Sequence, residues 1–334
     1  MNKKALRADI LLLLTALIWG FGFVAQRSGM EYVGPFTYNA LRFCLGSLSL
    51  LPIIFYRAKK NPTKNRGVSG KTFFLSSLAA GTCLFFGVML QQLGLMFTTA
   101  GNAAFITGLY AVLTPIFGSF WGQKTGRWTW VGALFTLVGL YFLSAAGNLH
   151  AINVGDILTF MCAFFWAAHV LLIDRLVLRN DPICLSAGQF AVCGLLCFPF
   201  AFLVEPRINV FIAGIAPSLL EKGTFAWQPI IDIAAGFAST SAVDMVNLLI
   251  PILYGGLASV GIAYTLQVVA QRDAPPAHAT IILCFEGCFG ALGGVLILAE
   301  PIGHWTLLGF ALMLVGMLLS QWEVIIKSRR KEVV

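Results

Sequence analysis

The chain has 334 residues, of which 58% are hydrophobic and only 11% are charged, and its mean hydropathy is +0.85. A single soluble core could not bury so much apolar surface, so the composition indicates a membrane protein. The net charge of +8 could suggest nucleic-acid binding, but the positions of the basic residues, given below, exclude that partner.

Ten apolar segments are each long enough to cross about 30 Å of hydrocarbon as a helix. We expect spans over residues 8–26, 36–56, 72–97, 101–121, 129–146, 155–173, 183–204, 246–269, 276–298 and 304–323. The first span follows a short basic N-terminus and so resembles a secretory signal peptide. Its sequence recurs further along as GDILTFMCAFFWAAH, however, which favours a span that the mature protein keeps.

The chain repeats itself at an offset of 147 residues without a gap. A second offset, of 177 residues, aligns GRWTWVGALFTLVG from Gly126 with GHWTLLGFALMLVG from Gly303. We therefore expect two copies of one unit, over residues 1–147 and 154–325, with about 30 extra residues near 205–245 forming an external insertion. The first offset pairs Asp9 with Asp156, Trp19 with Trp166, Pro35 with Pro182, Phe43 with Phe190 and Pro52 with Pro199.

Each copy holds five spans, an odd number, so the second copy enters the membrane from the opposite face. Inverted repeats of this kind are typical of secondary transporters, whose substrate site lies near mid-membrane between the halves. With a cytoplasmic N-terminus, 18 of the 22 lysine and arginine residues lie on the cytoplasmic side, whereas Arg27, Arg207 and Lys222 lie outside and Arg42 lies within a span. This asymmetry predicts a bacterial inner-membrane protein with both termini in the cytoplasm.

Several motif-like strings predict no cofactor. Residues 20–25 fit a GxGxxA pattern but lie in a membrane span rather than between a strand and a helix. Residues 67–72 end like a phosphate-binding loop, yet Asn65 stands where that loop needs glycine. The eight cysteines lie in or beside apolar spans without metal-ligand spacing, so we expect no disulfide, metal or cofactor.

Arg42 lies about two turns into the second span, with Tyr38 and Asn39 one turn earlier on the same face. Its counterpart in the other repeat is the uncharged Gln189. A charge inside a span is costly unless it faces a polar cavity or a partner. Arg42 is therefore a candidate for binding the substrate or for gating, and the alternatives are a structural ion pair or a contact with outer headgroups.

Glu286 lies in the ninth span among small and apolar residues, where desolvation favours the neutral form of a carboxyl group. It is the candidate for proton coupling, and the alternative is a buried structural acid. His169, one turn after Trp166, is a further candidate, although a lone histidine among apolar residues is more often a packing residue.

The other candidates are amide and aromatic side chains in spans from both halves. Facing a common cavity, they would suit an amphipathic or zwitterionic solute. They are Trp19, Gln91, Gln92, Asn102, Tyr110, Trp166, Tyr264 and Gln267.

Stretches such as ALIWGFGF, QQLGLMFTTAGNAAFITGLYAVLTP and LAEPIGHWTLLGFALMLVGMLLSQ resemble the EamA family of the drug/metabolite transporter superfamily, over nearly the whole chain. The resemblance implies ten helices in two inverted five-helix repeats. It implies a central cavity lined by spans one to four and six to nine, with spans five and ten bracing it. Many members carry Glu-Pro in span nine, where this chain has Glu286-Gly287 and so lacks a helix-bending proline.

We therefore expect an all-α integral membrane protein that exports small organic solutes, such as amino acids, metabolites or drugs, by alternating access. Uptake is the alternative within this class. A lipid-modifying enzyme is disfavoured, because the sequence offers no Ser/His/Asp set, metal cluster or close carboxylate pair. The expected partners are the solute, the lipid bilayer and a proton gradient, and the sequence leaves open whether the protein is a monomer or a homodimer.

Overall fold

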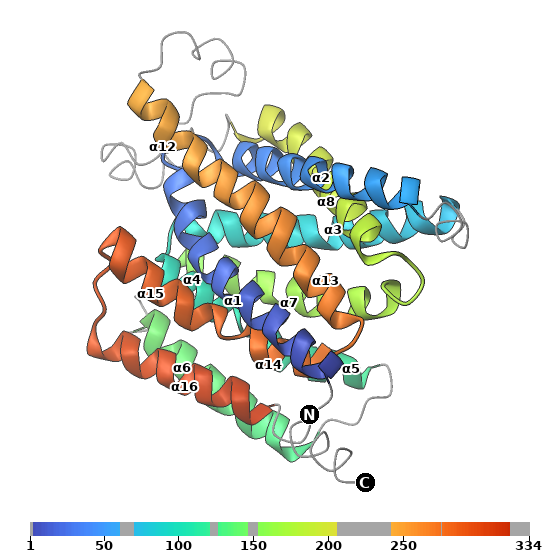
Figure 1. Cartoon of the computed structure of the whole chain (residues 1–334). Helices are drawn as coiled ribbons and strands as arrows, with labels where there is room; N and C mark the ends of the chain where they lie inside the picture. Colours follow the sequence, from blue (N-terminus) through green and yellow to red (C-terminus); the bar gives the residue numbers. More distant parts are fainter. Residues whose placement is uncertain are drawn as a thin grey trace.

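The computed structural model describes residues 3–60, 70–120, 126–145, 153–205, 242–274 and 276–320, and all regular structure in these ranges is helical, as expected (Figure 1). Eight helical segments in them are long and apolar enough to cross a membrane. The apolar helices α6 (Arg127–Ala145) and α16 (His304–Ser320) lie where the fifth and tenth spans were expected, but they are shorter and are not among these eight. The eight segments are α1 (Lys3–Gly29), α2 (Pro35–Lys60), α3 (Gly70–Leu95), α4 with α5 (Ala100–Thr107, Tyr110–Ser119), α7 (Val154–Leu176), α8 (Pro182–Leu203), α12 with η3 and α13 (Ala242–Leu253, Tyr254–Tyr264, Thr265–Gln271), and α14 with α15 (Pro276–Leu283, Glu286–Leu298).

The outer surface of these helices is rich in large apolar side chains. Leu134 on α6, Leu195 on α8 and Leu296 on α15 are each more than 60% exposed. Such exposure is unfavourable in water but suits a surface that contacts lipid. The external insertion predicted near 205–245 falls almost entirely outside the described residues.

Two of the expected spans are interrupted near their middle. Between α4 and α5 the backbone tightens to hydrogen bonds that reach three residues back, as from Leu109 N to Ile106 O. The same happens between α14 and α15, from Phe285 N to Ile282 O, where the Cys284 thiol also donates to the Ile281 carbonyl at 2.8 Å. The absence of the Glu-Pro pair left a bend in the ninth span open, and the structure interrupts the helix there without a proline.

The eighth span contains a π-helix, η3, which was not predicted. Three side-chain hydrogen bonds join it to α1: Trp19 Nε1 donates to Ser259 O at 3.3 Å, Thr15 Oγ1 donates to Ala263 O at 3.2 Å, and Tyr254 Oη donates to Ile18 O at 2.9 Å. Long π-helical segments are rare and occur mostly at functional sites. This one fixes α1 and the eighth span side by side.

Carboxylates from distant elements hold the first turns of α2 and α4. Glu205, which follows α8, accepts hydrogen bonds from Phe36 N at 3.1 Å and from Thr37 Oγ1 at 2.5 Å. Glu300, which follows α15, accepts from Ala100 N at 2.7 Å. Negative groups stabilise helix N-termini, so these contacts orient the helices that carry Arg42 and Thr107.

Helices α6 and α16 run side by side at one edge of the molecule (Figure 1). Glycines bring their backbones into close contact: a Cβ atom placed at Gly316 would lie 2.6 Å from Gly132 O and 2.7 Å from Thr136 N. Small residues are the usual means of close helix packing in lipid.

This contact predicts that Gly316→Ala destabilises the protein by about 1–3 kcal/mol, because backbone atoms would have to move apart. The matched control is Gly303→Ala, where the nearest atom would be 3.9 Å away. Thermal unfolding in detergent should show a lower melting temperature for Gly316→Ala alone. Equal melting temperatures for the two variants would contradict the close packing.

Candidate functional site

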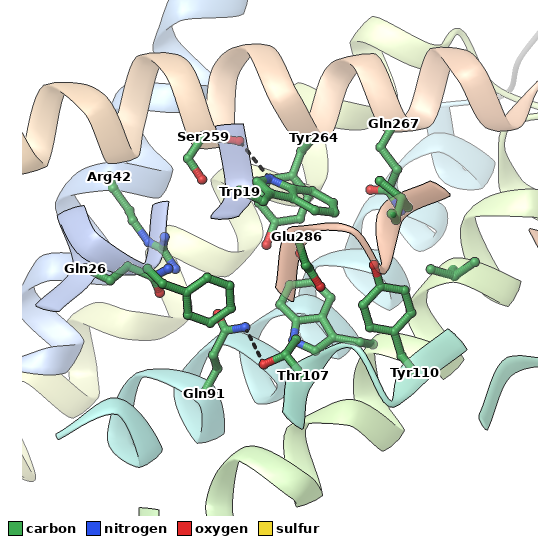
Figure 2. A pocket seen from close by; sticks show the side chains of 14 residues that line it. Trp19, Gln26, Arg42, Gln91, Thr107, Tyr110, Ser259, Tyr264, Gln267 and Glu286 are labelled. Carbon is green, nitrogen blue, oxygen red and sulfur yellow. Dashed lines mark hydrogen bonds between the residues drawn. The ribbon is translucent and has the colours of Figure 1, made fainter. Parts of the chain in front are cut away.

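A small buried cavity lies beside the two helix interruptions, and Figure 2 shows the 14 side chains that line it. It offers about 30 Å³ to water-sized molecules, which is room for roughly two of them. A solute therefore requires the surrounding helices to move apart. The lining residues are Trp19, Phe23 and Gln26 of α1, Arg42 of α2, Gln91 of α3, Thr107 of α4, Tyr110 of α5, Trp166 and Val170 of α7, Ser259 and Tyr264 of η3, Gln267 of α13, Leu283 of α14 and Glu286 of α15.

Arg42 is one of the residues that line the cavity, and the whole residue is only 2% exposed. Its Nε atom donates to Asn39 Oδ1 at 2.6 Å, and the group lies 5.0 Å from the ring centroid of Phe43 and 5.5 Å from that of Tyr38. Among the described residues no carboxylate forms an ion pair with it. The planar end of Arg42 thus remains available to a ligand, and this geometry matches a carboxylate.

Glu286 is the first residue of α15 and is 3% exposed. The Tyr110 hydroxyl faces it closely enough to interact electrostatically, but neither Tyr110 Oη nor Glu286 Oε1 makes a hydrogen bond of good geometry to a described residue. Figure 2 shows Arg42 and Glu286 both directed into the cavity. The cavity therefore holds one basic and one acidic group that do not pair with each other.

Aromatic rings from both halves of the chain meet at Tyr264. Its ring centroid lies 4.5 Å from that of Trp19, 5.9 Å from Trp166, 6.0 Å from Phe43 and 5.8 Å from Phe190. Trp19 and Trp166, which are repeat partners, thus both contact Tyr264, and their own ring centroids lie 6.4 Å apart. The result is an apolar wall with polar tips, suited to the apolar part of an amphipathic solute.

Several polar atoms around the cavity have no hydrogen-bond partner within the described part of the chain. They include Gln26 Oε1, Trp166 Nε1 and Gln267 Oε1. Each buried polar atom without a partner costs about 1–3 kcal/mol. By contrast, Gln91 Nε2 donates to Thr107 Oγ1 at 3.1 Å. A polar solute or water in the cavity would satisfy the free atoms.

Of the candidates from sequence, eight line the cavity: Trp19, Arg42, Gln91, Tyr110, Trp166, Tyr264, Gln267 and Glu286. The other five lie outside its lining. Tyr38 and Asn39 support Arg42, and the Tyr38 hydroxyl donates to Pro251 O at 3.0 Å.

The remaining three make other contacts. Gln92 Nε2 donates to Gln26 O at 3.5 Å. His169 Nε2 lies 2.9 Å from Gln189 Oε1, so the residue that replaces arginine in the second repeat pairs with a histidine. Asn102 lines a separate cleft near Glu300.

Six lining residues were not predicted: Phe23, Gln26, Thr107, Val170, Ser259 and Leu283. A signal was available for two of them, because Phe23 and Gln26 follow Trp19 at helical spacings of four and seven residues. The amide of Gln26 also belongs to the residue type that indicated Gln91 and Gln267. Thr107 and Ser259 depend on the helix interruption and the π-helix, which the sequence pattern did not indicate.

A larger groove, of about 720 Å³, lies on the other face of α1, between α1, α12, η3 and α15. Its lining is mostly apolar, and the exceptions are Ser28, Glu31, Tyr32, Asn247 and Tyr254. The groove is open to the surroundings, whereas polar groups from many helices converge on the central cavity. The central cavity is therefore the better candidate site.

Comparisons with known proteins agree with this arrangement. The model of the EamA-like transporter family matches residues 6–145 and again residues 153–322. A transporter of Archaeoglobus fulgidus, described as uncharacterised, is 29% identical over 322 residues, covering 96% of this chain and 88% of the relative. A solved protein structure matches with a TM-score of 0.62 at 16% identity, covering 97% of this chain and 98% of that one, which shows a shared fold.

Two further relatives match about half of the chain. YedA, described as an uncharacterised inner membrane transporter of Escherichia coli K12, is 27% identical over 52% of this chain and 54% of its own length. A probable amino-acid metabolite efflux pump of Salmonella typhimurium is 26% identical over 52% of this chain and 54% of its own length. Because the family model covers most of the chain, this protein belongs to the EamA-like transporter family and is a multi-pass membrane transporter of small solutes.

Proposed function

We propose that this protein is a secondary transporter that exports small zwitterionic solutes, such as amino acids and related metabolites, across a bacterial inner membrane by alternating access. The observation that carries the proposal is the buried cavity that contains Arg42 and Glu286 without an ion pair between them.

A zwitterion fits this cavity because its two charges complement the two groups present. The Arg42 guanidinium would bind a carboxylate through paired hydrogen bonds. Glu286, once deprotonated, would bind an ammonium group. The rings around Tyr264 would contact the rest of the solute, so that all parts of an amino acid find a partner.

The same arrangement offers a coupling mechanism. A proton and a substrate ammonium group would compete for Glu286, because a carboxyl group that carries a proton no longer attracts a cation. Release of substrate outside would then be favoured by protonation there, and release of the proton inside would prepare the site for the next substrate. This exchange would export solute at the expense of a proton gradient.

Two inverted repeats, 1–147 and 154–325, would supply the moving halves. In support, the helix contacts recur with the repeats exchanged: α1 packs against α14, α15 and η3, whereas α7 packs against α4, α5 and α3. The repeat partners α2 and α8 pack on each other, as do α6 and α16. Exchanged contacts of this kind are expected around a pseudo-two-fold axis in the membrane plane.

Contacts at the start of each repeat would serve as gates. Asp9 Oδ1 lies 2.7 Å from His278 Nε2 in α14. Asp156, the repeat partner of Asp9, accepts a hydrogen bond at 2.5 Å from Thr98 Oγ1, just before α4. In the proposed topology these contacts lie on opposite sides of the membrane. Opening either side would require its contact to break.

Export is favoured over uptake because one relative is named a probable amino-acid metabolite efflux pump. Uptake remains the second candidate, since a gradient can drive the same cycle in reverse. No specific observation on the described residues favours a lipid-modifying enzyme.

The proposed topology predicts the side on which each loop lies. Reporter fusions after residues 65, 127 and 330 should be active as cytoplasmic reporters, and fusions near 150 and 225 as periplasmic ones, because of the distribution of basic residues. A periplasmic signal at position 65 would contradict the topology.

Replacing Arg42 with Gln, the residue at the equivalent position of the other repeat, should weaken substrate binding by about 10- to 100-fold, since charge-assisted hydrogen bonds contribute about 1.5–3 kcal/mol. The measurement is uptake into everted membrane vesicles over a range of substrate concentrations. Arg42→Lys, which keeps the charge but not the planar fork, should give an intermediate value. Unchanged transport by Arg42→Gln in correctly folded protein would show that Arg42 is only structural.

Glu286→Gln should abolish accumulation driven by a pH gradient, because the amide can neither bind nor release a proton. Substrate exchange between the two sides of a proteoliposome needs no net proton movement, so it should persist at high substrate concentration. Its apparent affinity should be weaker, because the amide no longer attracts the ammonium group. A Glu286→Gln variant that still accumulates substrate in response to a pH gradient would exclude Glu286 as the coupling group.

A further inference from the structure

A second polar cleft lies away from the central cavity, where α2 and α13 end and α7 connects to α8. Its volume is about 260 Å³. Three arginines line it, one from each of these parts of the chain: Arg57 in the last turn of α2, Arg179 in the α7–α8 connection and Arg272 directly after α13. In Figure 1 the α7–α8 connection extends from the same end of the helices as the C-terminal end of α2.

The net charge of this arginine cleft is positive. The single acidic residue in its lining is Asp181, whose Oδ2 lies 3.6 Å from Arg57 Nη1. Asp181 also caps α8, accepting hydrogen bonds from Ile183 N at 3.0 Å and Cys184 N at 3.2 Å. Because the helix N-terminus and Arg57 both compensate this carboxylate, Arg179 and Arg272 contribute positive charge without an opposing group in the lining.

The connection that carries Arg179 is fixed in place by its neighbour. Asn180 is 7% exposed, and its Nδ2 donates to Ser76 Oγ of α3 at 3.1 Å and to Leu176 O at 2.9 Å. The backbone of Asn180 also donates to Leu176 O at 3.1 Å. The cleft is thus framed by a turn anchored to a third helix rather than by a loose loop.

Apolar side chains lie next to the three guanidinium groups. Ile54, Val177, Leu178 and Ile183 belong to the same lining, and Leu178 is 75% exposed. An exposed leucine beside arginines at the end of membrane spans is suited to the boundary between acyl chains and headgroups. A free phosphate would use the arginines but not these apolar contacts.

We infer that the arginine cleft binds the phosphate group of an anionic phospholipid, with the acyl chains against Ile54 and Leu178. Basic pockets between membrane helices on the cytoplasmic side commonly bind such headgroups. The leaflet follows from the proposed topology, which places this end of the helices inside. Binding itself does not depend on the transport activity proposed above.

Such a lipid would connect the two halves of the transporter. Arg57 belongs to the first repeat, on the helix that also carries Arg42. Arg179 and Arg272 belong to the second repeat, and Arg272 directly follows the helix that carries Gln267. One phosphate contacting all three would hold the inner ends of α2 and α13 together. The lipid would therefore stabilise the conformation in which this cleft is formed.

The test uses the purified full chain in dodecyl maltoside micelles and needs no transport assay. Cys184 lines the cleft and is half-buried, so its rate of alkylation by N-ethylmaleimide, followed by peptide mass spectrometry, reports occupancy. Phosphatidylglycerol should slow this reaction, whereas phosphatidylcholine and millimolar inorganic phosphate should not. The lipid concentration that gives half-protection measures affinity.

Arg179→Gln combined with Arg272→Gln should weaken that affinity about 30-fold, from roughly 1 kcal/mol for each arginine near an anionic headgroup. The control is Lys59→Gln with Lys71→Gln, which removes two exposed charges at the same end of the helices but outside the cleft. Unchanged affinity in the arginine variant would overturn the inference. So would equal protection by inorganic phosphate, or no protection of the unmodified chain by phosphatidylglycerol, a result that does not depend on the folding of any variant.

Discussion

The central site is organised around a buried guanidinium group, that of Arg42, which has no carboxylate partner in the described part of the chain. Arg42 is held by Asn39 and by the rings of Tyr38 and Phe43, but these contacts leave its charge uncompensated. A charge in this position is costly, so residues of this kind usually mark a binding site or a pathway. The helix that carries it is in turn oriented by Glu205, through the hydrogen bonds to its first turn.

The backbone around the site departs from regular α-helix in three places, and each departure brings a polar group to the cavity. The interruption between α4 and α5 places Thr107 and Tyr110 at the lining, the one between α14 and α15 places Glu286 there, and η3 places Ser259 and Tyr264. Irregular backbone inside a membrane is tolerated where it is buried in protein or lines a cavity. The irregular segments of the backbone are thus the ones that carry several of the polar lining residues.

The sequence predicted much of this because apolar length and internal repetition are strong signals. The all-helical fold and the location of the eight long apolar segments follow from these signals. The repeat offset also aligns Trp19 with Trp166, but the contact between their rings was not predicted. These signals could not indicate side-chain direction within a span: Tyr38 and Asn39 share a face with Arg42, yet they support it instead of lining the cavity. Asn102 was expected in the cavity because it lies in the fourth span, but its position near the N-terminus of α4 places it by Glu300. The π-helix and the interruptions depend on tertiary contacts, such as those between α1 and η3. A hydropathy pattern carries no information about such contacts, so it could not predict them.

The central claim is that one solute contacts Arg42 and Glu286 at once, and calorimetric binding to the purified protein tests it most directly. For each of a panel of amino acids, binding is compared with that of the amine that lacks the carboxyl group and of the acid that lacks the amino group. The account predicts that at least one amino acid binds about tenfold or more tightly than both of its analogues, because each analogue leaves one buried charge without a partner. If the amine or the acid binds as tightly as the amino acid throughout the panel, the two groups do not act on one zwitterion and the account is wrong.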